Sequence, residues 1–197
     1  MATIPKDELK RKGFHMVSLI YVFGYWYLSK PVVIWGLAIA IFIVALLEIL
    51  RFKVPACNAF FCNNFKGFYR PEEAEKISGL IFTLSGALIA ILLFPNKYMV
   101  MASFLYLAFG DSAAALAGKS IGRHKSFAGK SVEGSIACFI ACFVAGLFLF
   151  NWKFALAGAF VATIVEAIPW KISDNFWMQI VNAGVLTLLS GIMTWSK

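Results

Sequence analysis

The chain has 197 residues, of which 61% are hydrophobic and only 14% are charged, and its mean hydropathy is +0.80. Soluble domains are roughly half apolar, so this composition excludes an ordinary soluble enzyme and indicates an integral membrane protein. The net charge of +8 could suggest nucleic acid binding, but lysine and arginine in a membrane protein first report its orientation. We therefore expect no nucleic acid partner.

Seven apolar segments are predicted to cross the membrane as helices, at 14–29, 32–50, 77–94, 98–118, 132–150, 153–170 and 176–195. They leave no room for a separate soluble domain, so residues 1–197 are predicted to form one all-α integral membrane domain. The basic N-terminus is followed by no small-residue cleavage site, and we expect it to be retained. Segment 56–70 mixes aromatic and polar residues and is predicted to lie at the membrane interface.

The charged residues are distributed unevenly across this topology. With a cytoplasmic N-terminus, 14 of the 18 lysines and arginines lie on the cytoplasmic side, and only Lys30, Lys97, Lys153 and Lys197 lie opposite. The positive-inside rule therefore predicts an inner-membrane protein with a cytoplasmic N-terminus and, with seven spans, an external C-terminus. All ten acids also lie on or near the cytoplasmic side: Asp7, Glu8, Glu48, Glu72, Glu73, Glu75, Asp111, Glu133, Glu166 and Asp174. This pattern predicts a cytoplasmic site for an anionic substrate and a divalent metal.

The densest cluster of charge and glycine lies between Gly110 and Gly134. Asp111 lies near the inner end of the fourth span, where a carboxylate is costly and usually has a functional role. The small residues that follow it let a ligand or another helix approach closely, and both interpretations stay open. Gly118 and Gly122 permit close backbone approach, while Lys119, Arg123 and Lys125 supply positive charge that suits a polyphosphate. An ordinary positive-inside loop would need the lysines but not the glycines.

The triplet Gly129, Lys130 and Ser131 is not a nucleotide P-loop, because that motif requires glycine where this chain has His124, and a preceding strand. Ser131 and the free N–H groups at the start of the fifth helix can still bind phosphate. Glu133 lies in the same first turn, where it could either act in catalysis or complement the helix dipole.

Further candidate residues lie outside this block. Arg11, Lys12 and His15 lie at the mouth of the first span and could reach a phosphate, although an interfacial histidine more often only forms a hydrogen bond. Other polar residues near the inner helix ends could line the site or form structural pairs: Glu48, Arg51, Glu166, Asp174 and Asn175. The cysteines, Cys57, Cys62, Cys138 and Cys142, have no metal-knuckle spacing and are interpreted as packing residues.

Together these residues resemble the CTP-dependent lipid-alcohol kinases, a family that includes dolichol kinase, phytol kinase and CTP-dependent diacylglycerol kinase. The resemblance covers essentially the whole chain and rests on four motifs: Gly110, Asp111, Ala114, Ala115, Gly118, Gly122 and Arg123; GKSVEGS at 129–135; RK-x-x-H at Arg11, Lys12 and His15; and EILR at 48–51. In the first motif, Gly118 stands one position earlier than in the family pattern.

The resemblance implies transfer of the CTP γ-phosphoryl group to the hydroxyl of a membrane lipid, leaving CDP and a lipid phosphate. It implies that Asp111, shared with Glu133, binds Mg²⁺ or Mn²⁺, and that either carboxylate orients the alcohol. The cations that would hold the triphosphate are Lys119, Arg123, Lys125 and Lys130, and Lys130 would also act in catalysis. Close approach would be allowed by Gly118, Gly122 and Gly129, and phosphate would also be bound by Ser131, Lys12 and His15.

Two alternatives remain open. The chain also resembles, more distantly, the CTP:phosphatidate cytidylyltransferases, but it lacks their carboxy-terminal K-D and H-G-G-x-x-D-R signature. An anion transporter is the alternative outside enzymes, although acids confined to one face argue against it. The expected partners are CTP, membrane lipid and a lipid alcohol, with an isoprenoid such as a polyprenol favoured over diacylglycerol. Monomer and homodimer both remain open.

Overall fold

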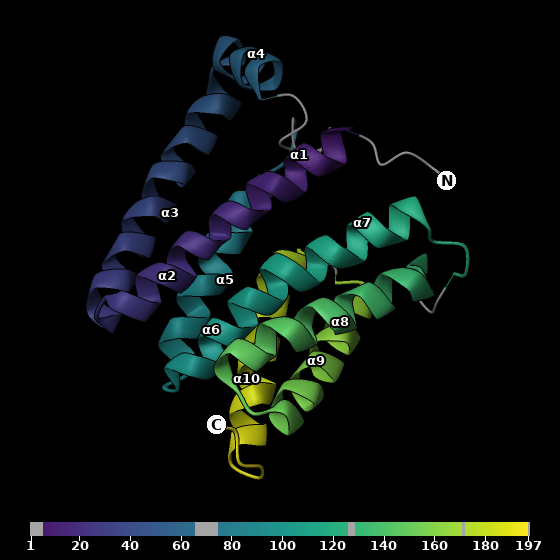
Figure 1. Cartoon of the computed structure of the whole chain (residues 1–197). Helices are drawn as coiled ribbons and strands as arrows, with labels where there is room; N and C mark the ends of the chain where they lie inside the picture. The colour runs from purple at the N-terminus through teal and green to yellow at the C-terminus, as the bar shows by residue number, and fades with distance from the viewer. Residues whose placement is uncertain (1–5, 66–74, 126–128, 171, 197) are drawn as a thin grey trace.

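The computed structural model describes residues 6–65, 75–125, 129–170 and 172–196, and this part of the chain is almost entirely helical (Figure 1). The helices are α1 (Lys6–His15), η1 (Met16–Ser18), α2 (Leu19–Tyr27), α3 (Lys30–Lys53), α4 (Pro55–Asn64), α5 (Gly79–Leu93), α6 (Lys97–Leu105), the π-helical η3 (Tyr106–Asp111), α7 (Ser112–Ser120), α8 (Val132–Leu149), α9 (Trp152–Ala167) and α10 (Asp174–Ser190). Within the described ranges no strand forms, and one isolated bridge joins Lys125 to Ser131.

The all-α class is confirmed, and each of the seven predicted apolar segments coincides with one helix or with a continuous run of helices. Three helical stretches are long and apolar enough to cross a membrane: Lys30–Lys53, Lys97–Ser120 and Val132–Leu149. Gly79–Leu93 is a shorter apolar helix. Seven crossings and a cytoplasmic site therefore remain predictions. Of the predicted interfacial segment 56–70, residues up to 64 lie in α4, and residues 66–70 lie outside the described residues.

Local sequence explains where several helices begin. Ser131 and Asn151 cap α8 and α9, since their side-chain oxygens accept hydrogen bonds from the backbone N–H groups of Gly134 (3.1 Å) and Phe154 (3.0 Å). Proline stands in the first turn of α3 and of α4, where its missing N–H is not needed by the helix. These signals fix the start of α8 directly after the glycine and lysine loop.

The short π-helix η3 forms the centre of the fold. It contacts η1 and α6 to α10, and its residues Tyr106, Leu107 and Ala108 are fully buried. At Gly110 a Cβ atom would lie 2.5 Å from Cys142 Sγ and 3.2 Å from Cys138 Sγ, so glycine lets α8 pack against this segment. Single-turn π-helices occur frequently at functional sites, and this one ends at Asp111.

Small residues let the surrounding helices pack closely, and large apolar residues cover the outside. Alanines of α5, α6, α9 and α10 are fully buried, including Ala90, Ala102 and Ala159. In contrast, α3 exposes large apolar side chains such as Trp35 (69%) and Phe42 (69%). Soluble monomers rarely expose contiguous apolar patches of this kind. The packing therefore supports a membrane protein, with α3 at the periphery of the bundle (Figure 1).

Candidate functional site

Asp111 is the acid on which the candidate site is centred. It ends η3, and its carboxylate pairs with the ammonium group of Lys12 on α1. His15, one turn further along α1, places Nε2 3.7 Å from Asp111 Oδ2. This nitrogen is buried and has no hydrogen-bond partner among the described residues. The structure thus brings Asp111 next to two residues about one hundred positions earlier in the chain, and places two nitrogen groups beside its carboxylate.

A second ion pair lies next to the first and involves Glu8. Its carboxylate is 2.5 Å from Arg11 Nη2 and 2.6 Å from Lys119 Nζ, so it joins α1 to the end of α7. Burial raises the pKa of the Glu8 carboxyl, but the hydrogen bonds from Arg11 and Lys119 and their positive charges outweigh this effect and hold the pKa below its usual value. Two candidate phosphate-binding cations are therefore held by one nearly buried acid.

Glycines bring the end of α7 against the start of α8. A Cβ atom at Gly118 would lie 3.0 Å from Ser131 Oγ, and one at Gly134 would lie 2.8 Å from the Ala114 carbonyl oxygen. At Gly122 the added atom would lie 2.2 Å from the Gly118 carbonyl oxygen. These glycines make close helix packing possible here, as one of the two sequence interpretations predicts, and that packing fixes the ends of the loop between the helices.

The basic loop folds back onto the start of α8. Glu133 is 2.8 Å from His124 Nδ1, and the backbone N–H of Val132 donates to the His124 carbonyl oxygen. Arg123, His124 and Lys125 are exposed, and Gly129 has a φ of +80°, which glycine adopts without strain. Residues 126–128 lie outside the described residues. Glu133 thus sits at the loop, while the metal role predicted for it stays a prediction.

Lys130 points from the loop toward α9 and α10. Its Nζ is 2.7 Å from Glu166 Oε1 and also contacts the Glu166 carbonyl oxygen, and it lies 3.9 Å from Asp174 Oδ2. The Glu166 side chain is only 7% exposed. The geometry therefore joins Glu166 and Asp174, predicted only as lining residues, through Lys130.

The acid and arginine at the end of α3 form a separate anchor. Arg51 Nη2 is 2.7 Å from Glu48 Oε2 and donates to the Lys76 carbonyl oxygen at 2.7 Å. Glu48 also accepts from the backbone N–H of Ser78 at 3.3 Å. These bonds fasten the end of α3 to the start of α5, so within the described contacts this motif has a structural role.

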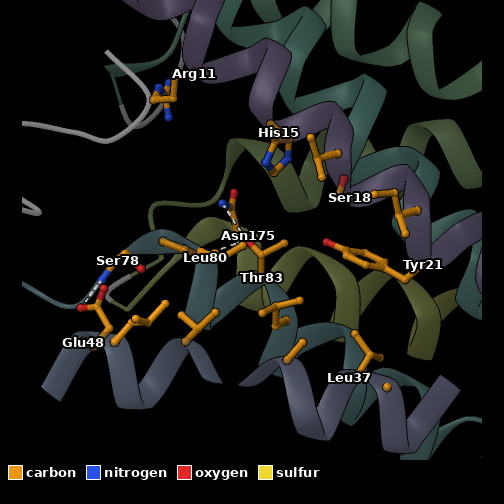
Figure 2. Close-up of a pocket in the computed structure, with 18 of the residues that line it drawn as sticks. Arg11, His15, Ser18, Tyr21, Leu37, Glu48, Ser78, Leu80, Thr83 and Asn175 are labelled. Atoms are coloured by element: carbon orange, nitrogen blue, oxygen red, sulfur yellow. Dashed lines mark hydrogen bonds between the residues drawn. The ribbon is translucent and has the colours of Figure 1, made fainter. Parts of the chain in front are cut away.

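A cavity of about 620 Å³ lies between the α1–α2 segment, α3 and α5 (Figure 2). At one end it is lined by polar residues, including Lys12, His15, Glu48, Asp111 and Asn175. Beyond them the lining is mostly apolar, with η1 and α2 on one wall and α3 on the other. Figure 2 shows His15, Ser18 and Tyr21 following one another along the first wall. The cavity thus joins the candidate site to an apolar interior.

A metal fits this arrangement when a nucleotide supplies part of its ligands. Among the described residues, no group of three or more His, Cys, Asp or Glu side chains could hold a metal ion. Mg²⁺, however, is usually bound by one or two carboxylates together with substrate phosphates and water. The carboxylate of Asp111, at the polar end of the cavity, suits that mode.

Sequence reasoning did not identify three features of this region. Glu8 is one, because its partner Lys119 is 111 residues away. The π-helix is another, since hydropathy carries no signal for it. The third is a polar network in which Asn175 Nδ2 donates to Thr83 Oγ1 (3.2 Å) and Gln179 Nε2 donates to the Thr83 carbonyl oxygen (2.9 Å). The spacing of Asn175 and Gln179, one turn apart in an apolar helix, is a signal that could have revealed it.

Comparison with known proteins gives relatives over most of the chain. CTP-dependent diacylglycerol kinase 1 of Saccharomyces cerevisiae is 30% identical over 199 residues, which cover 96% of this chain and 64% of the yeast protein. The Schizosaccharomyces pombe protein of the same name is 28% identical, over 72% of this chain and 74% of its own length. An uncharacterized Rickettsia prowazekii protein is 31% identical, over 82% and 79%.

The chain therefore spans just under two thirds of the Saccharomyces relative and about three quarters of the other two. No family model and no solved structure matches it. The chain is thus similar over most of its length to CTP-dependent diacylglycerol kinases, which supports its membership of the CTP-dependent lipid kinase family.

Proposed function

We propose that this protein transfers the γ-phosphoryl group of CTP to the hydroxyl of a membrane lipid alcohol. The observation that carries the proposal is the position of Asp111. Its carboxylate lies beside Lys12 and His15, at the polar end of a cavity whose other walls are apolar. A phosphate donor and a greasy alcohol can both reach such a place. The relatives' names, which specify CTP and diacylglycerol, support the donor and the class of acceptor.

In the proposed reaction the acceptor oxygen forms a bond to the γ-phosphorus, and the bond from that phosphorus to the oxygen bridging it to the β-phosphorus breaks. The products are CDP and the lipid phosphate, and the hydroxyl proton passes to a carboxylate or to water. Such a transfer depends on positioning and on stabilising the charge of the phosphate oxygens. A bound Mg²⁺ would neutralise charge on the β- and γ-phosphates, with Asp111 as its protein ligand and Glu166 or Glu133 as the second acid.

The cations of the site are proposed to bind the triphosphate. Lys119 lies at the end of α7, Arg123 and Lys125 lie in the loop that follows, and Lys130 lies just before α8. Lys12 and Lys130 already neutralise Asp111 and Glu166, so nucleotide binding would exchange these carboxylate partners for phosphate oxygens. A lysine suits this exchange because its ammonium group is a flexible point charge.

The experiment is a transfer assay with purified protein, CTP, Mg²⁺ and a panel of lipid alcohols that includes diacylglycerol, phytol and a polyprenol. We expect a lipid phosphate to form, with CTP preferred over ATP, and we expect Asp111→Asn to abolish its formation. If no lipid alcohol is phosphorylated, or if Asp111→Asn keeps full activity, the proposal is wrong. Uptake of an anion into proteoliposomes without any transfer would instead favour the transporter.

A further inference from the structure

The apolar part of the cavity has a shape that a hydrocarbon chain would fit. Four residues of α3 face it in succession, Gly36, Ala40, Val44 and Leu47, and they recur at the spacing of one helix face. On the opposite wall Gly24 of α2 also lines it. A Cβ atom at Gly24 or Gly36 would have no neighbour within 4 Å, so these glycines leave space open between the helices.

The polar end of this cavity belongs to the candidate site. Lys12, His15 and Asp111 line it, and the unpartnered Nε2 of His15 lies at the same end. A ligand here would therefore keep a polar group at Asp111 and extend an apolar body between α2 and α3. The position of α3 suits this, because α3 is anchored at its inner end by the pair Glu48 and Arg51 and has large exposed faces elsewhere.

The length of the apolar lining restricts the kind of ligand that would fill the cavity. Val32 and Leu47 both line the cavity, and 15 residues of α-helix between them span about 22 Å at about 1.5 Å per residue. One leaflet of a bilayer supplies about 15 Å, half of its roughly 30 Å hydrocarbon core. The lining is thus longer than a chain that merely stays in its own leaflet would need.

We infer that the cavity between α2, α3 and α5 is the binding site for the hydrocarbon chain of the acceptor lipid, and that it selects acceptors whose chain exceeds one leaflet in length. This inference rests on the proposed function for the identity of the ligand. Each additional carbon inside the cavity adds van der Waals contacts with its walls, so binding strengthens until the lining is filled. The apolar lining selects for chain length and not for the headgroup, so a long prenyl chain and a long acyl chain would both fill it.

The first test compares acceptors of one headgroup and increasing chain length. In detergent, we expect kcat/KM to rise by at least tenfold from a short chain to one that fills about 22 Å. Gly36→Trp and Ala40→Trp place an indole in the cavity, and each should lower the ratio of long-chain to short-chain kcat/KM at least tenfold. The control, Ile39→Trp, lies on the same helix at a side chain that is 56% exposed and outside the cavity lining, and it should leave the ratio unchanged.

The second test does not depend on turnover. A long-chain alcohol with a photoreactive group near its end should crosslink to α2 or α3 residues of the cavity, such as Gly24 or Val33, and unlabelled acceptor should compete with it. Crosslinks confined to exposed faces, without competition, together with an unchanged chain-length ratio in both tryptophan variants, would overturn the inference. If unlabelled acceptor competes with the crosslink but the protein phosphorylates no alcohol, the binding site for the hydrocarbon chain is supported and the proposed function is refuted.

Discussion

The pair Lys130 and Glu166 allows a sharp test of how the site is held together. Glu166 is 7% exposed and Lys130 28% exposed, with 2.7 Å between Nζ and Oε1. Removing one partner of a buried pair typically costs about 3–5 kcal/mol, because the other charge is left uncompensated. Since Lys130 is partly exposed, we expect Lys130→Met to cost about 2–3 kcal/mol. For a chain of this size that corresponds to a fall in Tm of roughly 4–12 °C.

The double variant separates structure from phosphate binding. Lys130→Met combined with Glu166→Gln removes both charges, so we expect most of the lost stability to return, a coupling of about 2 kcal/mol. Affinity for CTP should stay low in both proteins if Lys130 binds phosphate. Thermal unfolding in detergent and CTP titration measure the two effects. Lys153→Met, on an exposed lysine beside Trp152, is the control for a lost surface charge.

Two outcomes would contradict this reasoning. One is a Tm for Lys130→Met equal to that of Lys153→Met, which would mean that Glu166 does not need its partner. The other is a double variant that is less stable than either single variant, because a true pair must show partial rescue.

Three further predictions follow from the contacts of the described residues. The lowered pKa of Glu8 stabilises the folded protein above about pH 4.5, and this contribution is lost as the pH falls through the folded-state pKa. Glu8→Gln should remove it, so the free energy of unfolding measured from pH 7 to pH 3 should depend less on pH in the variant. An identical pH dependence in the two proteins would contradict the pairing. Gly134→Ala should destabilise the protein by about 1–3 kcal/mol, because its Cβ would lie 2.8 Å from the Ala114 carbonyl oxygen, whereas Gly13→Ala meets nothing within 4 Å and should be neutral or stabilising; equal Tm values would refute the close packing. Asp111→Asn should lower Tm, because it leaves Lys12, which is 4% exposed, without its anionic partner. Adding Lys12→Met to that variant should restore part of the lost Tm without restoring activity.

Much of the fold could be predicted from the sequence because its helices are long apolar runs separated by turns. Ser131 marks a helix start that the structure confirms. The helix boundaries follow from hydropathy, which needs no knowledge of neighbours. Hydropathy does not predict how a helix is rotated about its own axis. A helix that is apolar all round, such as α3, therefore does not reveal which of its faces lines a cavity.

The candidate site could be predicted in its residues but only partly in its contacts. Asp111 is identified from its cost at membrane depth, and its neighbours Lys12 and His15 are identified, together with Arg11, as a separate trio. Their meeting depends on tertiary packing over about one hundred residues, as does the pairing of Lys130 with Glu166. The metal role that the family resemblance implies for Asp111 and Glu133 stays a prediction, and the structure places Glu133 against His124.

The central claim is that the γ-phosphoryl group of CTP reaches a lipid hydroxyl, and the most direct measurement follows the fate of each phosphorus. Purified protein is incubated with Mg²⁺, a lipid alcohol or a lipid phosphate, and CTP labelled at either the α- or the γ-position. We predict γ label in the lipid, CDP as the other product and no release of pyrophosphate. Label from the α-position in the lipid, with pyrophosphate released, would contradict the account and identify a cytidylyltransferase.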